Sequence, residues 1–205
     1  IFLLVRLHKM DLKQKRMDEL IHQIRECSKC TLWKNAKNPV PGEGDLNTSL
    51  MMIGEAPGYH EDIKGQPFVG SAGRVLDELL LSIGIKRNEV FIGNIIKHRP
   101  NENRDPNEEE IKACGSYIER QIQIIKPRLI VTLGRHSTKY VMSNVDVKFR
   151  GISEIRGKVF EKHLFGIRLK IMPTFHPAAT LYNPTYRNFL ENDFQMINKL
   201  LEEFS

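Results

Sequence analysis

Four short apolar segments, each followed by a segment with helical periodicity, constrain the fold of this chain more than any other feature. The apolar segments span residues 49–57, 89–97, 128–134 and 169–176, and the helical ones span residues 71–85, 107–127, 135–143 and 186–204. A strand covered on both faces reads as a continuous apolar run, and strands that alternate with helices pair in parallel. We therefore predict an α/β fold, a three-layer α/β/α sandwich around a four-stranded parallel sheet.

The start of the chain and one irregular segment complete this prediction. Residues 10–27 have apolar residues at helical spacing, and a small hairpin is expected within the irregular residues 144–168. Position 1 is not Met, and the initial apolar run ends before Arg6, which is too short for a secretory signal or a membrane span. We predict one cytoplasmic domain over residues 10–205, with residues 1–9 as an N-terminal extension.

Chemically distinctive loops follow three of the predicted strands. They read "GEAPGYHED" (residues 54–62), "NIIKHRP" (94–100) and "TFHPAATLYNP" (174–184). In open parallel sheets, ligands bind beyond the carboxyl ends of the strands. We therefore expect the three loops to converge on one site.

Three side chains near these strand ends have both a structural and a functional interpretation. Phe68, in the loop "GQPFVG", is either a lid over a small core or a platform for a flat ring. Asn94 interrupts an apolar strand, and its buried amide needs a partner, either in the protein or on a nucleobase edge. His176 ends a strand before a proline, and is either structural or a group that stabilises developing negative charge.

The charge of the chain is compatible with a nucleic-acid partner. A formal net charge of +6 and an isoelectric point near 9.2 favour an acidic partner without requiring one. Arg99 and Arg104 lie on a loop that is either a solvated turn or a phosphate contact. Leu181 and Tyr182 follow His176, where they can wedge into a stacked duplex. These four side chains are the candidate DNA contacts.

The cysteines indicate a metal site. Cys27 and Cys30 form a Cys-x-x-Cys pair, with His98 and Cys114 further along the chain. Three cysteines without a secretory signal do not suggest a disulfide framework. On spacing alone, zinc in a Cys3His site and an iron–sulfur cluster are equally reasonable.

Three sequence blocks resemble those of a known family. The blocks "GEAPGYHEDIKGQPFVGSAG", "NIIKHRPNENRDPNEEEIKAC" and "FHPAA" are similar to those of the family 4 uracil-DNA glycosylases, the thermostable iron–sulfur type (type 4/5) of archaea and bacteria. The resemblance covers roughly residues 12–203. It implies a hydrolase that removes uracil from single- or double-stranded DNA and releases free uracil, which initiates base-excision repair. It also implies an intracellular, nucleoid-associated monomer with no membrane partner.

The resemblance assigns roles to individual residues. The backbone of Glu55 and Ala56 would contact the uracil ring, Phe68 would stack on it, and Asn94 would read its Watson–Crick edge. The catalytic residues would be His176 and Glu61. His176 would also contact uracil and stabilise the uracil anion as the glycosidic bond breaks.

Glu61 would position or activate the attacking water, or stabilise positive charge on the sugar. In family 1 enzymes an aspartate of the first block serves that water, and Ala56 stands at the matching position here.

The resemblance also implies a [4Fe–4S] cluster held by four cysteines. Cys27, Cys30 and Cys114 match three of them, and His98 stands at the fourth position, so we expect His98 to be the fourth ligand. The histidine can instead be a substitution that leaves the cluster strained or partly occupied. It can also mark kinship with relatives that bind uracil-DNA covalently through a histidine.

Three other functions stay open from the sequence. The pocket can belong to a non-catalytic or a covalent uracil-DNA-binding protein of the same superfamily. A zinc-stabilised α/β hydrolase acting on another substrate is the third reading. The presence of zinc and the absence of iron would favour that hydrolase.

Overall fold

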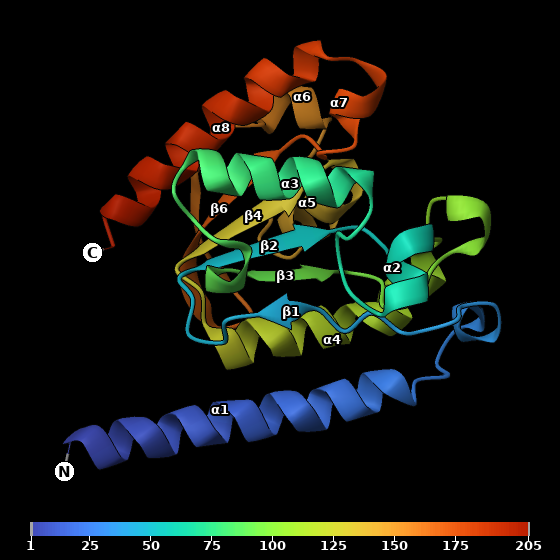
Figure 1. Cartoon of the computed structure of the whole chain (residues 1–205), viewed down its shortest axis with the longest axis vertical. Coiled ribbons are helices and arrows are strands. Elements are labelled where there is room, and N and C mark those ends of the chain that lie inside the picture. The colour runs from blue at the N-terminus through green and yellow to red at the C-terminus, as the bar shows by residue number, and fades with distance from the viewer. Residues whose placement is uncertain (1, 205) are drawn as a thin grey trace.

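The computed structural model describes the backbone of residues 2–204 and the side chains of residues 11–204, and its centre is a six-stranded sheet. The strand order is β1-β3-β2-β4-β6-β5, and helices pack on both faces (Figure 1). The strands are β1 (Glu43–Gly44), β2 (Leu50–Gly54), β3 (Phe91–Asn94), β4 (Leu129–Leu133), β5 (Phe160–Leu164) and β6 (Ile167–Thr174).

The four predicted strands form the centre of the sheet as a parallel set. β3 pairs with β2, β2 with β4, and β4 with β6, all in parallel. The predicted parallel sandwich is therefore confirmed, and two antiparallel edge strands extend it, β1 on β3 and β5 on β6. β5 and the start of β6 form the hairpin expected within residues 144–168. β1 has two residues and β5 is partly exposed, so neither gives a continuous apolar run.

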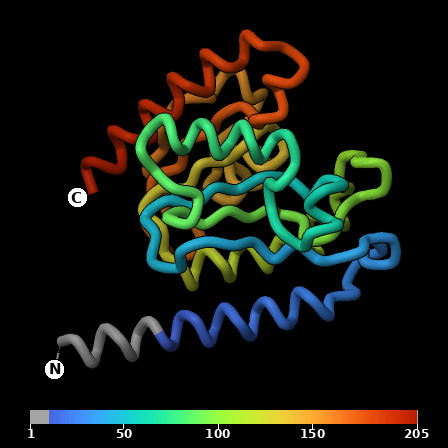
Figure 2. The backbone as a smooth tube through the Cα atoms, viewed as in Figure 1, coloured from blue at the N-terminus to red at the C-terminus, as the bar shows by residue number. Residues whose placement is uncertain are grey.

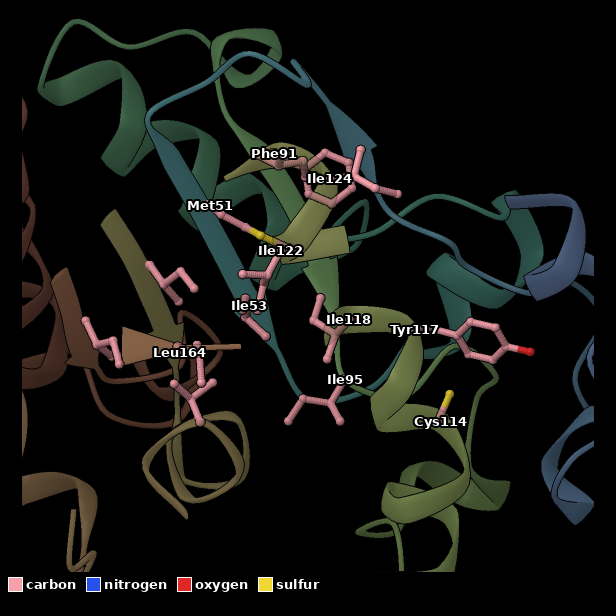
Figure 3. Close-up of a cluster of buried hydrophobic side chains, with 14 of the residues drawn as sticks. Met51, Ile53, Phe91, Ile95, Cys114, Tyr117, Ile118, Ile122, Ile124 and Leu164 are labelled. Carbon is pink, nitrogen blue, oxygen red and sulfur yellow. The ribbon is translucent and has the colours of Figure 1, made fainter. Parts of the chain in front are cut away.

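Alternate residues of β2 bind the two helical layers to the sheet. Leu50 and Met52 share a buried cluster with α3 and α8, whereas Met51 and Ile53 face the cluster that includes α4 (Figure 3). α1 packs alongside α4, outside this second layer (Figure 2). The α-helices are α1 (Phe2–Arg25), α2 (Tyr59–Lys64), α3 (Ser71–Ser82), α4 (Glu108–Ile125), α5 (Arg135–Ser143), α6 (Ile152–Ile155), α7 (Ala179–Tyr182) and α8 (Thr185–Glu202), and the 3-10 helices are η1 (Thr31–Lys34), η2 (Arg87–Glu89) and η3 (Asn101–Asn103).

The predicted N-terminal extension concerns residues whose side chains lie outside the described part of the chain. That prediction therefore stays a prediction. Within the described residues, no helix is long and apolar enough to cross a lipid bilayer.

A buried ionic group fastens α8 to the end of β6. Asp193 of α8 is 2% exposed and pairs with the guanidinium of Arg156, whose Nε donates to Oδ2 at 3.0 Å. The hydroxyl of Thr174, the last residue of β6, donates to the same carboxylate at 2.5 Å. This anchor lies two residues before His176, so it fixes the point at which the third loop leaves the sheet.

Replacing Arg156 with Met should destabilise the fold, because it leaves the Asp193 carboxylate buried without its cation. We expect the free energy of unfolding to fall by about 3 kcal/mol in urea denaturation. Arg168→Met is the matched control, since Arg168 pairs with Glu161 at the surface and should contribute less than about 1 kcal/mol. Equal effects of the two variants would contradict the anchoring role of Arg156.

Candidate active site

A cavity of about 350 Å³ opens at the carboxyl ends of β2, β3 and β6. The three predicted loops meet there, as expected for an open parallel sheet. The structure brings together at its wall every residue predicted to bind uracil or to act on it: Glu55, Ala56, Glu61, Phe68, Asn94 and His176. The convergence is thus observed, while the role of each residue stays a prediction.

Asn94 forms the floor of the cavity, and the absence of a side chain at Gly54 makes room for it. Gly54 and Asn94 face each other in the β2–β3 ladder. A Cβ on Gly54 would lie 2.3 Å from Asn94 Oδ1 and 2.8 Å from the Phe68 ring, so only glycine fits there. Asn94 is 2% exposed, and its Oδ1 accepts no hydrogen bond from the described residues. An unpartnered buried acceptor is costly, and this one is placed for a ligand donor.

Phe68 is held in an unusual backbone conformation beside the cavity. Its φ of 49° lies in the left-handed region that non-glycine residues rarely adopt. The residue is 5% exposed, and its ring stacks on the His176 ring, with centroids 5.4 Å apart and an interplanar angle of 26°. Gly73 of α3 permits this, because a Cβ there would lie 1.8 Å from the Phe68 carbonyl oxygen.

Glu61 is fixed by the loop that carries Phe68. The backbone N–H groups of Val69 and Gly70 both donate to Glu61 Oε1 at 2.8 Å. Gly70 immediately precedes α3, so the carboxylate sits at the N-terminus of that helix. Oε2 lies beside Gly58 on the cavity wall.

His176 presents a neutral ring with a defined tautomer. The Ala178 N–H donates to Nδ1 at 3.1 Å, so the ring proton lies on Nε2. Burial lowers the pKa of His176 to about 4, although the Glu61 carboxylate opposes the shift. At neutral pH the ring is therefore an uncharged hydrogen-bond donor through Nε2.

His136 was not among the predicted site residues, and it lies close to Asp105 and to Glu55, which lines the cavity. The ligand-type atoms of these three residues lie within 4.8 Å of one another. His136 Nε2 is 3.1 Å from Asp105 Oδ2 and 3.8 Å from Glu55 Oε2. Burial raises the pKa of Glu55 to about 7, and Asp105 adds to this shift while Arg135 opposes it. The position of His136, just beyond the end of β4, was the signal in the sequence.

Lys97 is a second unanticipated residue behind the cavity. Its side chain is fully buried, and Nζ donates to Asn94 O at 2.7 Å, Gln121 Oε1 at 2.7 Å and Pro41 O at 3.2 Å. Burial lowers the pKa of Lys97 to about 8. The lysine thereby supports the backbone of Asn94 from below.

The four candidate DNA contacts differ in whether their side chains already have partners within the protein. Leu181 and Tyr182 are exposed on α7, Tyr182 by 89%, as a wedge requires. Arg104 lines the cavity but forms a two-pronged ion pair with Glu110, at 2.6 and 2.9 Å. Arg99 donates to Asn103 Oδ1 at 2.8 Å and lies over the Tyr59 ring. The two arginines are therefore engaged within the protein.

The three cysteines gather between the end of α1 and α4. Burial raises the pKa of the Cys114 thiol to about 11, and the nearby Cys27 and Cys30 contribute to the shift. Burial also raises the pKa of Cys30, again with a contribution from Cys27. The thiols thus act on one another electrostatically, but their sulfur atoms do not all lie within 4.8 Å of one another, since among the described residues only Glu55, Asp105 and His136 bring possible metal-ligand atoms that close together. Three soft thiol ligands are of the kind that zinc and iron–sulfur sites use.

His98 is buried, but its surroundings differ from those of the thiols. Burial lowers its pKa, and the carboxylate that opposes this shift is Asp62. Asp62 in turn accepts the Lys37 N–H at 2.9 Å. The residue before His98, Lys97, contacts the thiol group directly, since the Lys97 N–H donates to Cys114 Sγ at 3.1 Å.

Comparisons with known proteins point to one superfamily. Residues 41–204 match the model of the uracil DNA glycosylase superfamily. The chain is 48% identical to a type-4 uracil-DNA glycosylase of Saccharolobus solfataricus over 186 residues, which cover 90% of this chain and 86% of that protein. It is 48% identical to the type-4 enzyme of Sulfurisphaera tokodaii, over 90% of this chain and 84% of the relative. The type-4 enzyme of Archaeoglobus fulgidus is 44% identical, over 90% and 92%.

The ring of His176 should stay neutral through the physiological pH range. Because its pKa in the folded protein is about 4, below the ordinary 6.5, the unfolded chain binds a proton first as the pH falls. Stability should therefore decline from about pH 6.5 toward pH 4. NMR titration of labelled histidine checks the ring directly and should show the Nε2–H tautomer. A cationic His176 at pH 6 would contradict this assignment.

Proposed function

The chain belongs to the uracil DNA glycosylase superfamily, and we propose that its cavity removes uracil from DNA by hydrolysing the N-glycosidic bond. The single observation that carries this proposal is the unpartnered Oδ1 of Asn94, buried at the floor of a cavity that also holds Phe68 and His176. Uracil carries an N3–H group, which can donate a hydrogen bond to this unpartnered oxygen. The reaction initiates base-excision repair, and we propose that the protein acts as a monomer.

Base binding uses the floor and one wall of the cavity. A base must leave the duplex to reach it, which costs a few kcal/mol. Stacking on an aromatic ring recovers roughly 1–3 kcal/mol, and Phe68 is the aromatic ring at this wall. The Asn94 amide offers an acceptor and a donor to the Watson–Crick edge, and the backbone of Glu55 and Ala56 borders the ring. These groups together select uracil.

Bond cleavage places negative charge on the leaving uracil. The electron pair of the C1′–N1 bond moves to the base, and a preorganised donor near its O2 is worth about 3 kcal/mol. The neutral His176 provides that donor through Nε2–H without carrying a charge of its own. Water then supplies the oxygen that bonds to C1′, and its proton is released. Glu61 Oε2, on the cavity wall, orients this water or stabilises the sugar cation.

The thiols of Cys27, Cys30 and Cys114 hold a [4Fe–4S] cluster in this proposal, and His98 is the candidate for the fourth ligand. The cluster ties the N-terminal helix to α4. Excision of a base transfers no electrons, so the cluster is structural. Zinc at the same thiols is the alternative cofactor.

Metal analysis of the purified protein distinguishes these cofactors. We expect iron and acid-labile sulfide in stoichiometric amounts, and we expect Cys114→Ala to lose most of both. Zinc without iron would overturn the iron–sulfur proposal. His98→Ala tests the fourth ligand separately, because full iron retention in that variant would remove His98 from the ligand set.

A uracil excision assay tests the function. An end-labelled oligonucleotide with one uracil is incubated with protein and treated with mild alkali, and a shorter band that requires uracil demonstrates excision. We expect His176→Asn and Asn94→Ala each to lower kcat/KM by about 100-fold or more. Unchanged substrate with folded, metal-loaded protein would contradict the proposal. A slower band that survives denaturation would instead reveal a covalent uracil-DNA-binding protein.

A further inference from the structure

We infer that Arg87 is a positioning residue for uracil binding, because its guanidinium and the Glu61 carboxylate hold opposite sides of the loop that presents Phe68. The inference rests on the proposed function, since it assigns the stacking of uracil to Phe68. Arg87 lies in η2, before β3, and is not part of the cavity wall.

Arg87 binds the carbonyl side of this loop. Its Nη1 donates to Phe68 O at 3.2 Å, and its Nη2 donates to Pro67 O. A guanidinium offers several donors in a rigid plane, so it can hold two successive carbonyls in one geometry. Lysine, with a single flexible ammonium, cannot reproduce this arrangement.

Glu61 binds the amide side of the same loop. The next two N–H groups, those of Val69 and Gly70, both donate to its Oε1 at 2.8 Å. The guanidinium of Arg87 therefore donates to the carbonyls of residues 67 and 68, and the carboxylate of Glu61 accepts from the amides of residues 69 and 70. The peptide units on both sides of the Phe68 Cα are fixed.

The backbone of Phe68 needs such support. Its φ of 49° is unfavourable for a residue with a Cβ and persists only where the surroundings enforce it. Without the guanidinium, the loop can relax toward an ordinary conformation. That relaxation would turn the ring away from the stacking position beside His176.

Arg87 is itself fixed from two directions. Its Nε and Nη2 donate to Glu43 Oε1 of β1 at 3.2 and 3.0 Å, and its Nη1 donates to Asp77 Oδ1 of α3 at 2.9 Å. Glu43 also accepts from Gln66 of the loop at 3.2 Å. The side chain of Arg87 is 25% exposed, so this group lies near the surface and its variants should fold.

A double-mutant cycle tests the inference. The variants are Arg87→Gln, Phe68→Ala and the double mutant, and the probe is DNA with one 2′-fluorinated deoxyuridine, whose glycosidic bond resists cleavage. Arg87→Gln should weaken binding of this DNA about tenfold and leave binding of the same DNA with thymine unchanged. In the Phe68→Ala background, loss of Arg87 should change affinity less than about twofold, because Arg87 acts through Phe68.

Arg187→Gln is the matched control. Arg187 also pairs with two carboxylates, Glu78 and Glu191, but it donates no hydrogen bond to the Phe68 loop. The control should bind both DNAs as the parent protein does. Arg87→Lys should behave like Arg87→Gln rather than restore affinity.

Two results would overturn the inference. One is unchanged affinity of Arg87→Gln for the fluorinated DNA, and the other is equal losses for Arg87→Gln in both backgrounds. If Arg87→Gln does not fold, Glu43→Gln takes its place and should show a smaller loss that also vanishes with Phe68→Ala. Excision of uracil by the parent protein is scored separately, so the inference can fail while the proposed function stands.

Discussion

The register between β2 and β3 is the constraint on which the pocket depends. It sets Gly54 opposite Asn94, and the pairing continues beyond the strands, since the N–H groups of Ile95 and Ile96 donate to Gly54 O and Glu55 O at 3.1 and 2.9 Å. The loop after β2 and the loop after β3 are therefore held edge to edge. Because Gly54 has no side chain, the amide of Asn94 and the ring of Phe68 meet over it, and together they form the floor and wall of the cavity.

Two polar groups of this pocket, Asn94 and His176, are kept unpartnered or uncharged by burial. Asn94 leaves one acceptor free, and His176 stays neutral with its proton on Nε2. Burying such groups lowers the stability of the protein without substrate. The well-packed layers and the Asp193 anchor compensate for this loss. Donors and acceptors fixed before the substrate arrives need no rearrangement when charge develops on the base, which is why their placement matters more than their charge.

The thiol site and the pocket share one segment of backbone. Lys97 donates through its N–H to Cys114 Sγ and through its Nζ to Asn94 O, so it contacts both. Under the proposed cofactor assignment, a metal centre bound to α4 and the end of α1 would therefore stabilise the strand end that carries Asn94. This arrangement would give the proposed metal a structural role in an enzyme whose chemistry transfers no electrons.

Local patterns in the sequence were enough to predict the four parallel strands and the edge at which the three loops converge, because apolar runs and glycine-rich loops act over a few neighbours. Phe68, Asn94 and His176 stood out at the strand ends, and the resemblance to a known family added roles for Glu55, Ala56 and Glu61. The edge strands β1 and β5 lacked such a pattern. The sequence left Arg104 as either a solvated turn residue or a phosphate contact, and it did not indicate the ion pair with Glu110 on the first turn of α4. The placement of Lys97 and Arg87 was decided by tertiary structure alone, because each acts through partners brought close only by folding. The sequence thus determined which residues form the site, and tertiary packing decided how they are held.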